Sequence, residues 1–206
     1  MKITRYLTGA IQANTYLAYD EETQKGFVVD PGGTCPELIE QAKNDCVDIT
    51  YIILTHGHGD HIGGVEDVLN AFPAAKIVAH KDEEEMLLDP SLNLSRDVCY
   101  KKVSLTADIL VEDKDTLNVG NLELTFIHTP GHSLGGMCIY TDGNLFCGDT
   151  IFHNSIGRSD FYGGDYRTLI NSIKDKIYVF PDDTVLFPGH MGTSTVGDEK
   201  RGNPFV

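Results

Sequence analysis

Short apolar runs recur along the chain, and glycine, proline, aspartate or asparagine residues bound them. Runs of this length with such boundaries are typical of β-strands. The predicted strands cover residues 16–19, 27–29, 51–54, 76–79, 122–127, 137–140, 145–147 and 185–187.

Helical periodicity is clearest over residues 166–178. Leu169, Ile173 and Ile177 recur at every fourth position there, so they form one apolar face. Asp165 precedes the segment, and an aspartate at this place is a favoured N-cap. The pattern predicts an amphipathic helix behind Asp165.

Three further helices are predicted between the strands. Residues 36–43 begin with a proline at the first helical position, and Thr34 is the predicted cap. The other two segments are 65–71 and 81–88. The acidic run 82–85 within the last of them is predicted to be a solvated helix face.

The order of these elements predicts an α/β fold. A chain of 206 residues can bury one sizeable core, and no linker or low-complexity tract divides it. We therefore expect a single domain over residues 1–206, with mixed β-sheets flanked by helices and functional loops along one edge.

Charge and cysteine content restrict the partners and the compartment. The net charge of -15 argues against nucleic acid and against an anionic membrane surface, because both require an excess of lysine and arginine. The five cysteines are scattered, without a C-x-x-C pair, and there is no apolar leader and no run of 18 apolar residues. We expect a cytoplasmic protein with reduced, buried thiols. Its oligomeric state is not predicted.

Candidate chemistry is concentrated directly after the predicted strand 51–54. His56, His58, Asp60 and His61 place three imidazoles and one carboxylate within six positions. Packing does not need such a loop, and buried charge is costly unless it is paired or bound to metal. The donor types indicate a divalent metal, zinc first, and more than one ion.

Three more donors follow other predicted strands. His132 and His190 each follow a Pro-Gly turn, and Asp149 follows the strand 145–147. The joint pattern of seven donors is far more specific than any one of its parts. The remaining histidines are predicted to be structural or exposed, namely His80, His128 and His153.

The segment from Thr55 to Gly64 resembles the defining motif of the metallo-β-lactamase superfamily, whose fold is a four-layer αββα sandwich. His132, Asp149 and His190 resemble its later ligands, in order. The resemblance implies a first metal on His56, His58 and His132, a second on Asp60, His61 and His190, and Asp149 bridging the two. Asp30 resembles an early aspartate that supports the histidine loop, although the residues alone allow a simple turn cap equally well.

Within the superfamily the chain resembles short forms of glyoxalase II, the hydroxyacylglutathione hydrolases. The likeness rests on residues 148–152, 155–161 and 195–204. It implies a thioester or ester substrate, with Arg158 and Tyr162 in contact with it. The alternative for Arg158 is pairing with Asp160 or Asp165. The C-terminal helical domain of full-length glyoxalase II, which holds the glutathione carboxylates, has no counterpart here.

The implied chemistry is hydrolysis by a hydroxide that bridges two metals and attacks a thioester carbonyl. Two zinc ions per chain are expected, and iron or manganese is possible. Asp60 is the predicted catalytic residue, because it can steer or receive the proton.

The alternative is a persulfide dioxygenase of the same fold. It would use one iron on His56, His132 and Asp149. A β-lactamase is not expected, because such enzymes are normally exported.

Overall fold

The computed structural model describes residues 1–206, and its core is built from two facing β-sheets. The first sheet has the order β1-β2-β3-β4-β5-β6. Its strands are β1 (Lys2–Thr8), β2 (Ala13–Tyr19), β3 (Lys25–Val29), β4 (Asp48–Ile53), β5 (Lys76–His80) and β6 (Ile109–Val111). Strands β1 to β3 pair antiparallel and β3 to β6 pair parallel, so the sheet is mixed.

The second sheet has the order β14-β13-β10-β9-β8-β7 and is also mixed. Its strands are β7 (Thr116–Val119), β8 (Leu122–His128), β9 (Met137–Thr141), β10 (Asn144–Gly148), β13 (Val185–Pro188) and β14 (Ser194–Thr195). Only β10 and β13 pair in parallel. A small ribbon of β11 (Ile151–Phe152) and β12 (Ser155–Ile156) follows β10.

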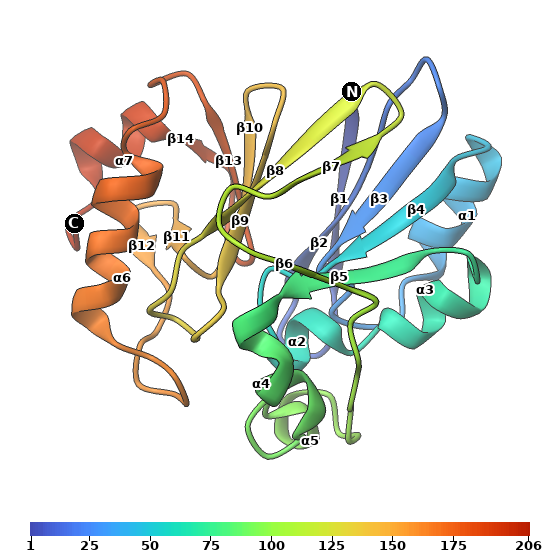
Figure 1. The fold of residues 1–206 in the computed structure, drawn as a ribbon, viewed down its shortest axis with the longest axis horizontal. Helices are drawn as coiled ribbons and strands as arrows, with labels where there is room; N and C mark the ends of the chain where they lie inside the picture. Colours follow the sequence, from blue (N-terminus) through green and yellow to red (C-terminus); the bar gives the residue numbers. More distant parts are fainter.

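Helices cover the outer face of each sheet (Figure 1). On the first sheet these are α1 (Pro36–Asn44), α2 (Gly59–Ile62) and α3 (Val65–Ala71). On the second they are α6 (Tyr166–Ser172), the π-helical turn Ile173–Ile177 and α7 (Val196–Gly202). The predicted four-layer αββα order is confirmed. A short 3-10 helix (Lys81–Glu83) with α4 (Glu84–Leu88) and α5 (Ser95–Val98) lies at one end of the sheets.

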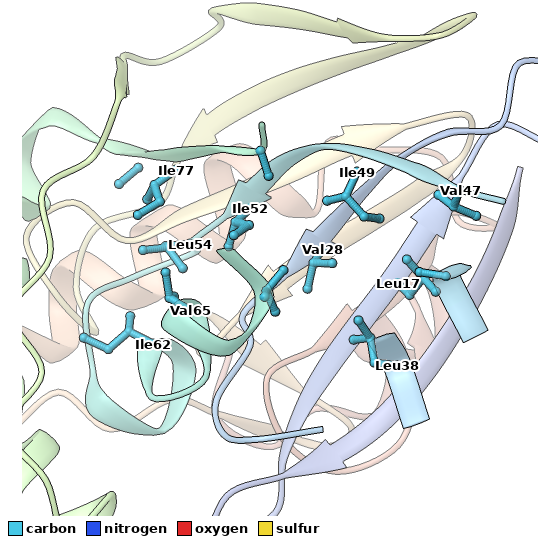
Figure 2. Close-up of a cluster of buried hydrophobic side chains, with 14 of the residues drawn as sticks. Leu17, Val28, Leu38, Val47, Ile49, Ile52, Leu54, Ile62, Val65 and Ile77 are labelled. Carbon is cyan, nitrogen blue, oxygen red and sulfur yellow. The ribbon is translucent and has the colours of Figure 1, made fainter. Parts of the chain in front are cut away.

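Three apolar layers hold these elements together. Side chains along β2 point alternately into two of these layers. Leu17 and Tyr19 pack outward with Leu38 of α1, whereas Tyr16 and Ala18 pack between the sheets. Side chains that alternate along a strand point to opposite faces, so a strand covered on both faces is apolar throughout. Figure 2 shows the outward layer, in which Leu17, Val28 and Ile52 meet the helices.

The third layer joins the second sheet to its helices. Leu169, Ile173 and Ile177, the periodic face predicted from the sequence, are all completely buried there. Asp165 caps α6 as expected, since its side chain accepts a hydrogen bond from the Thr168 amide at 2.7 Å. The predicted helix over 166–178 becomes π-helical at its end, which the periodicity does not indicate.

Several local expectations are wrong. Cys35, and not Thr34, occupies the N-cap of α1, because the Thr34 hydroxyl donates to Asp67 instead. The thiols are not all buried as expected: Cys138 and Cys147 are buried, but Cys46 is exposed. No helix in the structure is both long enough and apolar enough to cross a membrane.

Candidate metal centre

The candidate donors follow the carboxyl ends of strands in both sheets. His56 and His58 follow β4, His132 follows β8, Asp149 follows β10 and His190 follows β13. Because these strands end at the same edge of the sandwich, residues from distant parts of the sequence meet there.

Asp60 and His61 are presented by the single helical turn α2. His58 stands at its N-cap with an extended backbone, so the chain turns sharply between His58 and Asp60. The result is that one loop directs side chains towards two adjacent positions.

The first group of donors, here called the first trio, consists of His56, His58 and His132. Nε2 of His132 lies 2.9 Å from Nδ1 of His58 and 3.2 Å from Nε2 of His56. All three side chains are buried. Three imidazole nitrogens that converge in this way can bind one transition-metal ion.

The second trio consists of Asp60, His61 and His190. Oδ2 of Asp60 lies 3.3 Å from Nε2 of His61 and 3.2 Å from Nε2 of His190. The carboxylate adds a negative charge that the first trio lacks.

Asp149 lies between the two trios and faces both. Its Oδ2 is 3.5 Å from Nε2 of His132, in the first trio. Its Oδ1 is 3.4 Å from Nε2 of His61, in the second. Its Oδ2 is also 3.6 Å from Nε2 of His190, in the second trio. A carboxylate in this place can bridge two ions.

The unpaired buried atoms fit bound metal. Nε2 of His61 and Oδ1 of Asp149 are buried without a hydrogen-bond partner, although buried polar atoms are normally paired. The two atoms lie 3.4 Å apart, so a single cation between them could satisfy both. The two trios are therefore candidate metal-binding positions, the first buried and the second partly exposed at His190.

Hydrogen bonds on the far side of the rings fix their orientation. Asp30 accepts from the Thr55 amide at 2.7 Å and from the Thr55 hydroxyl at 2.6 Å, and lies 2.9 Å from Nδ1 of His61. Nδ1 of His132 is 2.6 Å from the Arg158 carbonyl oxygen. Partners of this kind hold a ligand's ring in place and select its tautomer.

The electrostatics set His56 and His58 apart from His61. Burial, together with the neighbouring imidazoles, holds the pKa of His56 well below its usual range and lowers the pKa of His58 to about 3. These rings are neutral at physiological pH, as metal ligation requires. Burial opposes charge on His61 as well, but the carboxylates of Asp60, Asp149 and Asp30 raise its pKa well above the usual value. The second trio therefore attracts positive charge.

The metal positions open into a cavity of about 260 Å³ with apolar walls. Ile11, Leu94, Val98, Phe152 and Phe161 line it, together with donors from both trios and Arg158. No lysine is among the lining residues.

The two predicted substrate contacts lie in different surroundings. Arg158 lines the cavity, yet it makes two hydrogen bonds to Asp160, at 2.9 and 2.7 Å, and stacks on the Phe161 ring at 4.0 Å. Tyr162 is not among the lining residues, and its hydroxyl donates to Glu85 at 2.6 Å. The guanidinium therefore has a carboxylate partner before any substrate arrives.

One acidic side chain near the first trio is buried, contrary to the prediction. Glu83 was expected on a solvated face, but it is 1 % exposed and accepts hydrogen bonds from the segments that carry the first trio. A signal was available, because Glu83, Met86 and Leu87 share the helical spacing of one face, and that face is buried. The apolar cavity walls carry no comparable signal.

The chain is similar to known proteins over nearly its whole length. The family profile described as "Metallo-beta-lactamase superfamily" matches residues 8–190. "Probable metallo-hydrolase YqgX" of Bacillus subtilis is 35% identical over 211 residues, covering 100% of this chain and 98% of that protein. "Hydroxyacylglutathione hydrolase GloC" of Haemophilus influenzae is 30% identical, covering 96% of this chain and 94% of that protein.

A solved structure is similar over the same extent. The structure described as BLEG-1 B3 metallo-beta-lactamase superposes with a TM-score of 0.92 and 36% identity, covering 99% of each chain.

Proposed function

The chain belongs to the metallo-β-lactamase superfamily, and from this premise we propose that it is a metal-dependent hydrolase that cleaves thioesters of small hydroxy acids. The observation that carries the proposal is the pair of complete trios with Asp149 between them. The thioester part of the proposal is supported by the similarity to GloC and by the glyoxalase II-like segments of the sequence.

The first trio would hold one ion and the second trio another, with Asp149 shared. Zinc suits the nitrogen-rich donors, and iron or manganese could take the same places. Bound dications supply Lewis acidity for the substrate carbonyl and lower the pKa of water, so that a nucleophile is available near neutral pH.

The protein's own residues would orient the reaction. Burial disfavours the charge on Asp60, but His61 and His190 hold the pKa of its carboxyl far below the usual range. Asp60 therefore stays ionised and can accept a hydrogen bond that orients the attacking group, although it is too weak a base to remove a proton by itself.

The cavity walls indicate what the substrate looks like beyond the carbonyl. Five apolar side chains on the wall favour a substrate with an apolar or neutral group. When such a substrate covers these side chains, water is excluded from the reaction. Arg158 is the one cation on the wall and is already paired with Asp160. We therefore expect a neutral thiol carrier to be accepted better than glutathione, which carries two carboxylates.

A direct test compares matched thioesters of one acyl group. Lactoyl-glutathione and the neutral lactoyl thioester of N-acetylcysteamine would be offered to the metal-loaded protein, with thiol release as the measurement. We expect both to be cleaved and the neutral one to give the higher kcat/KM. Failure to cleave either thioester would refute the proposal.

Two further assays on the same purified protein test the alternative activities. The similarity to BLEG-1 favours lactam hydrolysis as a second candidate, which a chromogenic β-lactam would report. One iron per chain with oxygen consumption on glutathione persulfide would support the dioxygenase. Much of the donor set is common to both enzymes, so the metal content decides: two ions per chain are expected for the dinuclear hydrolase and one iron for the dioxygenase.

A further inference from the structure

Glu83 is a buried carboxylate directly behind the metal centre. It ends the 3-10 helix Lys81–Glu83 and is 1 % exposed, whereas its neighbours Asp82 and Glu84 are exposed. Burial raises the pKa of Glu83 to about 7. A buried carboxylate is costly unless donors surround it, so its partners indicate what it does.

Both oxygen atoms of Glu83 accept hydrogen bonds, and the donors come from two separate segments. Oε2 accepts from the Gly57 amide at 3.1 Å. Oε1 accepts from the Gly135 amide at 2.8 Å and from the Ser133 hydroxyl. One side chain therefore ties the loop after β4 to the turn after β8.

These two segments carry every member of the first trio. Gly57 lies between His56 and His58, and Ser133 follows His132. We propose that Glu83 is the positioning residue of the first trio: it holds the two loops in register so that their three imidazole nitrogens converge. The proposal rests on the metal-dependent function proposed above.

Asp30 provides the comparison for the second trio. Its carboxylate is also buried, and it also accepts from a backbone amide, a hydroxyl and the ring of His61. Each trio thus has a buried carboxylate behind it, and Asp30 reaches the first trio only through the Thr55 hydroxyl, which lies 3.1 Å from Nδ1 of His56. Asp30 contacts a ligand ring directly, whereas Glu83 acts through the backbone on both sides of its ligands.

The packing around Glu83 leaves little room for it to move. A Cβ atom on Gly57 would lie 3.0 Å from Oε2 of Glu83 and 3.0 Å from Cγ of Met86. A Cβ atom on Gly135 would lie 2.6 Å from the Glu83 nitrogen. Both loops therefore approach Glu83 as closely as glycine allows, and a change in its side chain is transmitted to them.

The set of donors requires a carboxylate rather than an amide. The two backbone amides can only donate, and the Ser133 hydroxyl donates as well. A glutamine has nearly the same shape but only one acceptor oxygen, so its NH2 group would face a donor on one of the two loops. Glu83→Gln should therefore loosen one loop without opening a cavity.

The test is a metal titration of metal-free protein, with zinc binding read by calorimetry and cobalt binding by its absorption spectrum. The natural protein should take up two ions. In Glu83→Gln the affinity of one step should fall about 10- to 100-fold while the other step is unchanged. Asp30→Asn should weaken the other step most, because Asp30 contacts the His61 ring directly and His56 only through Thr55. Glu84→Gln, at the exposed neighbouring position, should weaken neither.

The outcomes separate the two proposals. A Glu83→Gln protein that melts earlier but keeps both affinities would show a purely structural role and overturn the inference. Absence of metal binding in the natural protein would refute the proposed function instead. If Glu83→Gln does not fold, Ser133→Ala, which removes one donor only, should weaken the same step by a smaller factor, and unchanged affinities in that variant would also overturn the inference.

Discussion

At the scale of single residues, Asp149 is the donor whose loss should cost most. It alone faces both trios, at 3.4 Å from His61 and 3.5 Å from His132. We expect Asp149→Ala to lower kcat by a factor on the order of 10⁴, because one change removes the shared ligand of both ions. Thioester hydrolysis and metal content per chain would be measured together.

The fold should survive this substitution, since Asp149 follows β10 and is not part of the apolar layers. A far-ultraviolet circular dichroism spectrum equal to that of the natural protein would check it. Asp183→Ala, at an exposed position, is the matched control and should leave turnover unchanged. Full turnover in Asp149→Ala would contradict the shared role.

His80 gives a prediction about stability and pH. Its ring stacks on His128 with centroids 3.9 Å apart, and burial with that neighbour lowers the pKa of His80 to about 4. In the unfolded chain its pKa is near 6.5, so the unfolded state binds the proton first as the pH falls. The contribution of His80 to stability is therefore complete above pH 6.5 and is lost progressively down to about pH 4.

The measurement is the free energy of unfolding of metal-free protein in urea at about pH 7 and about pH 4.5. His80→Asn should lose about 2 kcal/mol less than the natural protein over this range, a value reduced for solvent screening. Asparagine can still accept from the Asp82 amide, as Nδ1 of His80 does at 3.3 Å. Equal losses in both proteins would argue against the depressed pKa.

The residues that could be predicted from sequence are those whose chemical type already limits their use. Histidines in the spacing of His56, His58 and His61 have few purposes other than metal binding. Glutamate is a residue type that is usually exposed, so Glu83 cannot be told from Glu84 by type. Only its burial and its hydrogen bonds in the structure distinguish it. The convergence of donors could be expected, whereas the backbone contacts behind them could not.

At the scale of elements, the Asp165 cap should stabilise α6 without affecting the chemistry. Its side chain satisfies the Thr168 amide at 2.7 Å, an amide that the first turn of a helix leaves unpaired. Asp165→Ala should lower the free energy of unfolding by about 1 kcal/mol.

Asp165→Asn is the matched control, because asparagine caps almost as well. Urea unfolding and kcat would be compared in both variants. We expect kcat to be unchanged, because the Asp165 contact with the turn of His132 runs through its backbone, from its amide to the Gly131 carbonyl. If Asp165→Asn loses as much unfolding free energy as Asp165→Ala, the hydrogen bond from the Thr168 amide is not the cause of the loss.

Strands and helices were predicted where one face or both faces are consistently apolar. Residues 76–79 and 185–187 were predicted as strands and lie within β5 and β13. The edge strand β1 was not predicted, because its residues are mostly half-buried and its sequence mixes polar and apolar side chains. Helix ends were also difficult, since Thr34 looks like a cap but binds Asp67.

At the scale of the whole molecule, metal should stabilise the folded protein. The donors come from both sheets and are assembled only in the folded state, so ions bind that state in preference. Removing metal with a chelator should lower the Tm, and adding zinc back should restore it. At a free zinc concentration of about 1,000 times Kd the stabilisation is about 4 kcal/mol.

Differential scanning fluorimetry with and without chelator would measure this effect. Magnesium is a suitable control, because it prefers oxygen ligands and should not restore the Tm. Identical melting in all conditions would mean that the trios hold no metal.

The strand order and the pairing of the two sheets could not be read from the chain. Each apolar run indicates a strand but not its neighbour, and the parallel pair β10 and β13 joins segments that are distant in sequence. The four-layer order was predicted through the family resemblance rather than from the hydrophobic pattern alone.

The contact between the sheets beside His190 has a consequence for synthesis on the ribosome. Asn14 of β2 donates to the carbonyl oxygens of Pro188 and Met191, at 2.8 and 2.9 Å, on either side of that histidine. The side-chain amide of Asn14 is therefore synthesised long before the segment around His190 that it binds. The first trio can be completed once residue 132 has been synthesised, whereas the second has to wait for residue 190, so the two trios form in a fixed order during translation.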